Sequence, residues 1–82
     1  MITGGQIRAA RSMLRWRVED LAKRSGVGVR TILRLEAVDD VPQANVSTLK
    51  KITKSLESEG IEFVGSPDDA PGIRIHPRDK QV

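Results

Sequence analysis

Apolar side chains recur along the first 60 residues at the spacing of amphipathic helices. Four stripes repeat at i, i+3, i+4 or i+7, the intervals that place side chains on one face of a helix. They consist of Ile7, Ala10 and Leu14; Val18, Leu21, Ala22 and Ser25; Ile32 and Leu35; and Val46, Leu49, Ile52 and Leu56. Thr3 is suited to cap the first helix, and Asn45 or Ser47 the last. The pattern predicts four helices, of which the second and third are short.

Glycine and proline mark where these helices end. Gly26 supplies a left-handed stop after the second helix, Gly60 ends the fourth, and Pro42 places a loop between the third and the fourth. Beyond Gly60 the pattern alternates with period two in IEFV and in IRI, on either side of GSPDDAPG. We therefore expect two strands joined by a wide connection, followed by a disordered tail over 77–82.

The composition allows one small domain with a single core. The chain has 82 residues and no cysteine, which excludes disulfides and thiolate metal sites, and its one histidine lies six residues from the C-terminus. No segment has the apolar run of a secretory leader or the roughly 20 apolar residues of a membrane span. These features predict a soluble, cytoplasmic protein.

The net charge of +3 is unevenly distributed along the chain. Residues 1–54 carry eleven Lys and Arg against five Asp and Glu, a net +6, whereas residues 55–82 carry three against six, a net −3. A basic surface favours a polyanionic partner, so the basic half is the predicted contact surface. An ordinary solvated surface is the alternative explanation of the same charges.

Nothing in the sequence indicates catalysis. The paired carboxylates Asp39 and Asp40, and likewise Asp68 and Asp69, lie in predicted loops without a nucleophile, a nearby histidine or metal-ligand spacing. We therefore predict that the protein is not an enzyme, has no metal or cofactor, and has no evident small-molecule ligand.

The second and third helices meet at a glycine turn, which is the arrangement of a helix-turn-helix. The small residue Ala22 stands where the two helices cross closely, and Gly26 can adopt the positive φ that the turn requires. The second helix of such a unit packs through one narrow stripe and leaves its opposite side free to enter a DNA major groove about 12 Å wide. The spacing therefore predicts a DNA-binding unit.

The segment VEDLAKRSGVGVRTILRLE (18–36) resembles the helix-turn-helix of the phage-repressor-like (XRE, Cro-type) family of transcriptional regulators. The residues in this pattern are Leu21, Ala22, Gly26, Val27, Thr31, Ile32 and Glu36. The flanks are similar to those of short bacterial members, so that the resemblance covers about residues 2–75. It implies an all-α fold of four to five helices with a small C-terminal β-ribbon, divided into a DNA-binding domain over 1–60 and the ribbon over 61–76.

The resemblance also implies sequence-specific binding to double-stranded DNA and regulation of transcription, for instance as a repressor. Its recognition helix would span about residues 28–37, with Val29, Arg30 and Arg34 as base-contacting residues; arginine suits guanine, and valine suits a thymine methyl. The candidate phosphate-contacting residues are Arg8, Arg11, Arg15, Arg17, Thr31, Lys50 and Lys51. Trp16 is interpreted as a core residue between the first two helices rather than as a base-stacking platform.

The predicted ribbon also suggests how two copies of the chain could associate. One recognition helix covers few base pairs, so regulators usually use two copies that read half-sites about 34 Å apart. A two-stranded ribbon is marginal alone and exposes strand edges, which favours a homodimer; the alternative is that the ribbon folds back on its own helices. The predicted dimerisation residues are Ile61, Phe63, Ile73 and Ile75. An antitoxin or a protein-binding adaptor built on the same fold is the alternative function.

Overall fold

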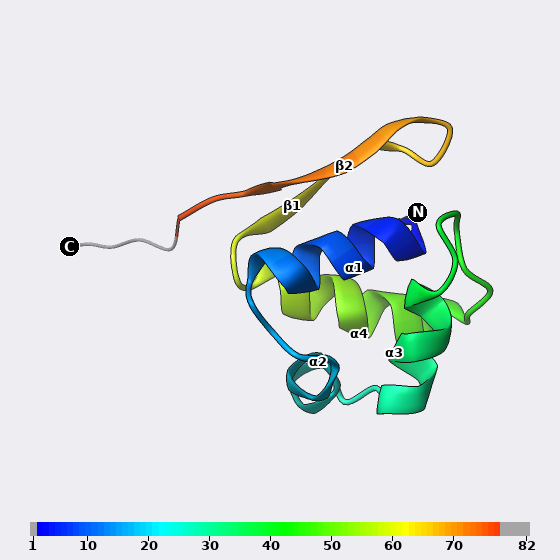
Figure 1. The fold of residues 1–82 in the computed structure, drawn as a ribbon, viewed down its shortest axis with the longest axis vertical. Coiled ribbons are helices and arrows are strands. Elements are labelled where there is room, and N and C mark those ends of the chain that lie inside the picture. The colour runs from blue at the N-terminus through cyan, green and yellow to red at the C-terminus, as the bar shows by residue number, and fades with distance from the viewer. Residues whose placement is uncertain (1, 78–82) are drawn as a thin grey trace.

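Residues 2–77 of the chain are described by a computed structural model, in which four helices precede an antiparallel β-hairpin (Figure 1). The helices are α1 (Gly4–Met13), α2 (Val18–Ser25), α3 (Val29–Glu36) and α4 (Val46–Glu57), and the strands are β1 (Ile61–Ser66) and β2 (Asp69–Ile75). Helices α1 and α4 lie beside one another, with α2 and α3 on one side of them. The hairpin runs along α1 on the opposite side.

Side chains that accept hydrogen bonds from unpaired backbone N–H groups set the starts of α1 and α4. Thr3 and Gln6 form a capping box: the Thr3 hydroxyl accepts from Gln6 N at 3.0 Å, and Gln6 Oε1 accepts from Thr3 N at 2.8 Å. The Asn45 side chain accepts from Thr48 N at 2.9 Å. The predicted caps of both helices are thereby confirmed.

One hydrophobic core joins the four helices to the first strand. Its buried apolar residues are Ile7, Ala10, Leu21, Val27, Ile32, Leu35, Leu49, Ile52, Leu56 and Ile61. Every predicted stripe contributes to this core. Val46 was also expected on the inner face of α4, but its side chain is 62% exposed, so that prediction is wrong. Val46 is the first residue of α4 and lies one turn before the buried Leu49.

The N-terminus of α1 lies directly against the end of α3 at Gly4. A Cβ atom at this position would collide with the backbone carbonyl oxygens of Leu35 and Val38. Gly4 N also donates a hydrogen bond to Asp40 O at 3.0 Å. The absence of a side chain therefore allows α1 to hold the segment that follows α3.

The hairpin is longer and more tightly connected than the sequence pattern suggested. Strand pairing continues to Ser66 and Asp69, so only Pro67 and Asp68 connect the two strands. The expected wide connection is therefore wrong. The register shifts next to Gly65, whose φ is 77°, because β2 has one residue more than β1 in this part of the ladder. The glycines and prolines of GSPDDAPG serve this irregularity and a tight turn rather than an open loop.

Gln6 fastens the hairpin to α1. Its side chain is buried, and Nε2 donates to Val64 O at 3.2 Å and to Gly72 O at 2.8 Å. Ile61, only 3% exposed, belongs to the same core as the helices. The fold is therefore mixed α and β, and the predicted all-α class is wrong, although the number of helices matches. The hairpin is a layer of the domain and packs on α1 and α4.

Within residues 2–77, no helix has the length and apolar character needed to cross a membrane. The predicted tail over 77–82 lies outside the described residues except for Pro77.

Candidate nucleic-acid interface

A short turn joins α2 to α3. Gly26 has a φ of 76° and ends α2, and its N–H donates to Ala22 O at 2.9 Å, which confirms the predicted left-handed stop. Val27 is buried in the core, and its N–H donates to the Ser25 hydroxyl at 3.1 Å. Gly28 is the N-cap of α3 and has no side chain with which to cap it. The positive φ of Gly26 and the buried side chain of Val27 thus define the connection between α2 and α3.

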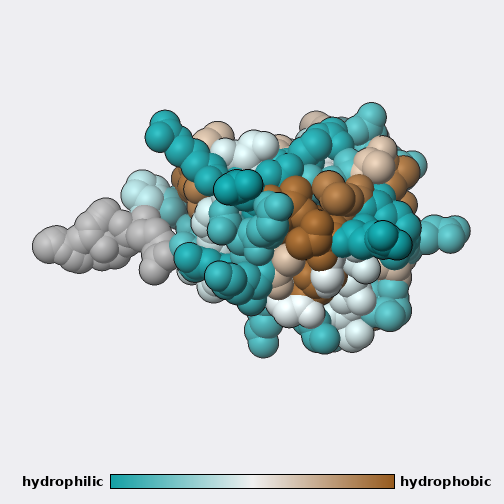
Figure 2. Space-filling view, turned by 60° about the horizontal axis from the view of Figure 1, so that its bottom comes forward, coloured by the Kyte–Doolittle hydropathy of each residue, from teal (hydrophilic) through white to brown (hydrophobic). Residues whose placement is uncertain are grey.

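Helix α3 has one buried face and one exposed face. Ile32 and Leu35 are fully buried, as predicted, and Glu36 is 5% exposed. The exposed residues that precede Glu36 are Val29, Arg30, Leu33 and Arg34. Figure 2 looks toward the end of the molecule formed by α2 and α3, and shows apolar surface bordered by hydrophilic side chains there.

The three predicted base-contacting residues are all exposed but differ in how free they are. Arg30 makes no hydrogen bond or ion pair with any residue in the range 2–77. Arg34 Nη1 donates to Gln43 O at 2.8 Å, which holds this guanidinium against the loop that follows α3. Val29, in the first turn of α3, is 36% exposed. Of the two cations on α3, only Arg30 is thus without a partner within residues 2–77.

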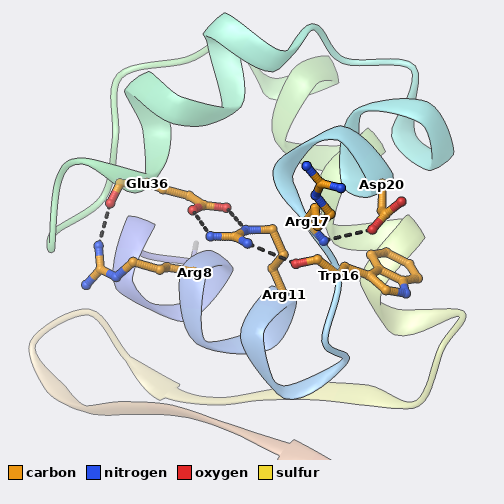
Figure 3. A network of polar contacts seen from close by, with 6 residues as sticks. All are labelled: Arg8, Arg11, Trp16, Arg17, Asp20 and Glu36. Atoms are coloured by element: carbon orange, nitrogen blue, oxygen red, sulfur yellow. Dashed lines mark hydrogen bonds and ion pairs between the residues drawn. The ribbon is translucent and has the colours of Figure 1, made fainter.

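Arg11 and Glu36 form a buried ion pair between α1 and the end of α3 (Figure 3). Arg11 Nε and Nη2 donate to the two Glu36 carboxylate oxygens, each at 2.9 Å, and the side chains are 18% and 6% exposed. Arg11 Nη1 also donates to Trp16 O at 2.9 Å. The hydrogen bonds to Glu36 raise the pKa of the Arg11 guanidinium above its ordinary value, against the opposing effect of burial. Arg11 therefore stays charged inside the fold.

Arg11 thus has a structural role that the sequence did not predict, and its phosphate contact stays a prediction. Its guanidinium nitrogens are committed to the protein, so it offers little to an external anion. Arg8 is also engaged: Nη1 donates to the Glu36 backbone carbonyl, and Nη2 donates to Asp39 Oδ1 at 2.9 Å. Both arginines hold the end of α3 and thereby orient its exposed face.

Four of the predicted phosphate-contacting residues are exposed on two other parts of the chain, the segment between α1 and α2 and helix α4. They are Arg15, Arg17, Lys50 and Lys51. Arg17 Nε lies 3.8 Å from Glu19 Oε1 in an exposed pair, which constrains the side chain only weakly. Thr31 is half-buried. The four cations are accessible to an anionic partner.

Trp16 packs against the core, as predicted. The guanidinium carbon of Arg24 lies 4.7 Å from the centre of its ring, and Arg24 Nη1 is 3.2 Å from Glu59 Oε2. A cation thus covers one face of the indole, and an acid on the segment after α4 holds that cation in place.

The predicted dimerisation residues lie mostly against the core of their own chain. Ile61 is buried, Phe63 and Ile73 are half-buried and pack against the core, and Ile75 is 39% exposed. The hairpin is therefore folded back on α1 and α4, which was the alternative considered from the sequence. In the described part of the chain, the sheet has two strands, and the outer edge of each is unpaired.

Sequence reasoning missed two buried polar side chains that support the site. Glu36 stands four residues after Ile32 and so continues the buried stripe of α3, and a carboxylate in such a position requires a partner. Gln6 stands three residues after Thr3, which is the spacing of a capping box. Both signals were present in the sequence, but neither identified Arg11 or the hairpin carbonyls as the partners.

Comparison with known proteins adds no relative. No protein-family model matches the chain, and a search of the curated proteins finds no significant match. Within residues 2–77, no group of three or more His, Asp or Glu side chains is placed to hold a metal ion. Functional interpretation therefore depends on the geometry and charge of α3 and its surroundings.

Proposed function

We propose that this protein is a sequence-specific double-stranded DNA-binding transcriptional regulator of the phage-repressor-like type, with α3 as its recognition helix. The observation that most supports this is the outward face of α3. This helix is only eight residues long, is anchored by Ile32, Leu35 and Glu36, and turns Arg30 and Arg34 away from the core. A short helix of this kind fits the major groove, about 12 Å wide. The resemblance of residues 18–36 supports the same function.

Arg30 is the principal base-reading residue in this proposal. Its guanidinium has no partner among the described residues, so it can donate two hydrogen bonds to O6 and N7 of a guanine without breaking a contact. Arg34 can do so only by exchanging the Gln43 carbonyl for an acceptor on DNA. The exposed cations Arg15 and Lys51 are assigned to the phosphate backbone in this proposal.

The first experiment is a gel-shift titration with a random-sequence duplex at several salt concentrations. Neutralising phosphates releases counterions, so affinity should fall steeply with salt, with a logarithmic slope close to the number of contacts. Lys51→Ala should weaken binding to all duplexes alike and make the slope shallower by about one. A variant that loses affinity for only one sequence would contradict the phosphate role of Lys51.

The second experiment tests direct readout by Arg30. A duplex is selected from a random pool with the wild-type protein, and Arg30→Ala should bind it less tightly by about 1 to 3 kcal/mol and lose preference at one base pair. Arg74→Ala is the matched control, because Arg74 is an exposed arginine on β2. Unchanged sequence preference in Arg30→Ala, or an equal loss in Arg74→Ala, would show that α3 is not the reader.

We also propose that the regulator is a homodimer that pairs through strand edges rather than through the apolar face of the hairpin, since that face covers α1. His76 N donates to Gly60 O at 2.7 Å, and the alternation of an antiparallel ladder then points Ile75 N–H away from β1. Ile75→Pro removes this donor, whereas Ile75→Ala keeps it. Sedimentation at tens of micromolar should show a dimer for the wild type and Ile75→Ala, and a monomer for Ile75→Pro. A wild-type protein that is monomeric both alone and on a palindromic duplex would disprove the dimer.

The alternative function is an antitoxin or an adaptor, in which the exposed face of α3 would contact a protein. If the protein does not bind duplex DNA, or if its affinity does not change with salt concentration, this alternative is favoured over a regulator.

A further inference from the structure

The exposed face of α3 carries an apolar strip that readout of guanine and phosphate does not use. Leu33 is 53% exposed and lies one turn after Val29, which is 36% exposed. Side chains at i and i+4 of a helix are neighbours, with about 5 to 6 Å between their Cβ atoms. Arg30 and Arg34, also one turn apart, lie beside this strip.

We propose that Leu33, together with Val29, forms a binding site for the C5-methyl groups of pyrimidines in the major groove, and that Leu33 determines specificity for thymine and for 5-methylcytosine. This inference rests on the proposed DNA-binding function. The thymine methyl is the apolar feature of the base edges exposed in the major groove, and a 5-methylcytosine presents its methyl group from the same ring position. The separation of the two side chains corresponds to one or two base-pair steps of about 3.4 Å, so the two methyl groups belong to nearby base pairs.

The dimensions of the strip favour DNA over a protein partner. A stable protein interface buries about 1,200 to 2,000 Å² in total, whereas this strip consists of two aliphatic side chains beside two guanidinium groups. On DNA the same arrangement is complementary, because the arginines can reach guanine or phosphate while the aliphatic groups contact methyl groups.

The experiment uses the full chain and one duplex selected by it from a random pool. Each thymidine of the duplex is replaced in turn by deoxyuridine, which removes the methyl group and keeps every hydrogen-bonding group. At one or two positions affinity should fall about fourfold, the factor that corresponds to burial of one methylene-sized group. At the same position, a C·G pair should bind about fourfold more tightly when its cytosine is methylated at C5.

Protein variants assign the methyl readout to Leu33. In Leu33→Ala, the affinity ratio of thymidine to deoxyuridine duplexes should fall to about one at one position, since most of the contact area with that methyl group is lost. Met13→Ala is the matched control, because Met13 is a similarly exposed apolar side chain, at 54%, on α1. It should leave the ratio at about four. Leu33 is already exposed, so its truncation leaves the core intact.

The outcomes separate this inference from the function on which it rests. Salt-sensitive binding to the selected duplex with no effect of deoxyuridine would overturn the methyl site and leave the DNA-binding function standing. Equal ratios in the wild type and Leu33→Ala would overturn the role of Leu33. Unchanged affinity for the duplex together with lost self-association in Leu33→Ala would assign the strip to a protein contact. The absence of salt-sensitive DNA binding would overturn both proposals.

Discussion

Removal of the Glu36 charge should destabilise this fold severely. In Glu36→Gln the Arg11 guanidinium loses its carboxylate partner, in a side chain that is only 18% exposed in the native fold. Breaking a buried ion pair by removing one partner costs about 3 to 5 kcal/mol, because the remaining charge loses its counter-charge. Arg11 is partly exposed and keeps its hydrogen bond to Trp16 O, so we expect a loss near the lower end of this range. A domain of 82 residues typically has a free energy of unfolding of about 4 to 12 kcal/mol. The variant should therefore lose a large share of its stability, and its Tm should fall on the order of 20 °C.

A double variant distinguishes the cost of leaving one charge unpaired from the loss of attraction between Arg11 and Glu36. Arg11→Met combined with Glu36→Met removes both charges and keeps apolar side chains of similar length. The double variant should therefore be destabilised less than Arg11→Met or Glu36→Met alone. A residual loss of about 1 kcal/mol is expected, because the Trp16 carbonyl also loses its donor from Arg11.

Urea and thermal unfolding followed by circular dichroism would measure these differences. Asp39→Asn is the control, because it breaks the exposed pair between Arg8 and Asp39, whose side chains are 45% and 89% exposed, and should cost less than about 1 kcal/mol. The reasoning is refuted if Glu36→Gln is no more destabilising than Asp39→Asn. It is also refuted if the double variant loses as much free energy as the sum of the two single variants.

Three further predictions concern the backbone and the hairpin. Gly4→Ala should destabilise the fold by about 1 to 3 kcal/mol in urea unfolding, because its methyl group would collide with carbonyl oxygens at the end of α3; an unchanged midpoint would contradict this. Gly26→Ala should lower the free energy of unfolding by about 1 kcal/mol through the positive φ alone, since no atom lies within 4 Å of a Cβ at this position. Gly28→Ser should raise it by a few tenths of a kcal/mol, because serine adds a side-chain N-cap to α3. Equal effects of the two substitutions would contradict both assignments. The hydrogen bond from His76 lowers the pKa of Glu62. The contribution of this pair to the stability of the fold is therefore fully present above the ordinary carboxyl pKa and is lost as the pH falls through the lowered pKa. NMR titration of Glu62 in His76→Ala should return this pKa toward its ordinary value, and no change would contradict the pairing.

Local patterns accounted for most of the helical part of the fold. Ile32 and Leu35 define the buried face of α3 because a helix of 3.6 residues per turn brings them together whatever the rest of the chain does. Thr3 and Gly26 mark a start and a stop for the same reason, since their effects act within one turn of the chain. The accessible position of Arg30 was predictable from the same periodicity.

The hairpin and the engaged arginines could not be predicted in this way. Period two indicated the strands, but the tight connection and the register depend on pairing across the ladder and on the irregularity at Gly65. Arg11 and Arg34 are of the residue type that commonly contacts DNA. Only the positions of Glu36 and Gln43 in the folded chain show that each arginine is held by the protein.

The starts and ends of the helices, their apolar faces and the concentration of positive charge could thus be predicted from the amino-acid sequence, because these properties arise from neighbours within a turn or two. Which charges are left for a partner, and where the hairpin lies, became clear only from the folded chain. Those outcomes depend on contacts between residues far apart in the chain, such as Gln6 with Gly72 O and Arg11 with Glu36. A charge pattern cannot distinguish a buried pair from a free cation, since the distinction lies in the partner and in the exclusion of water.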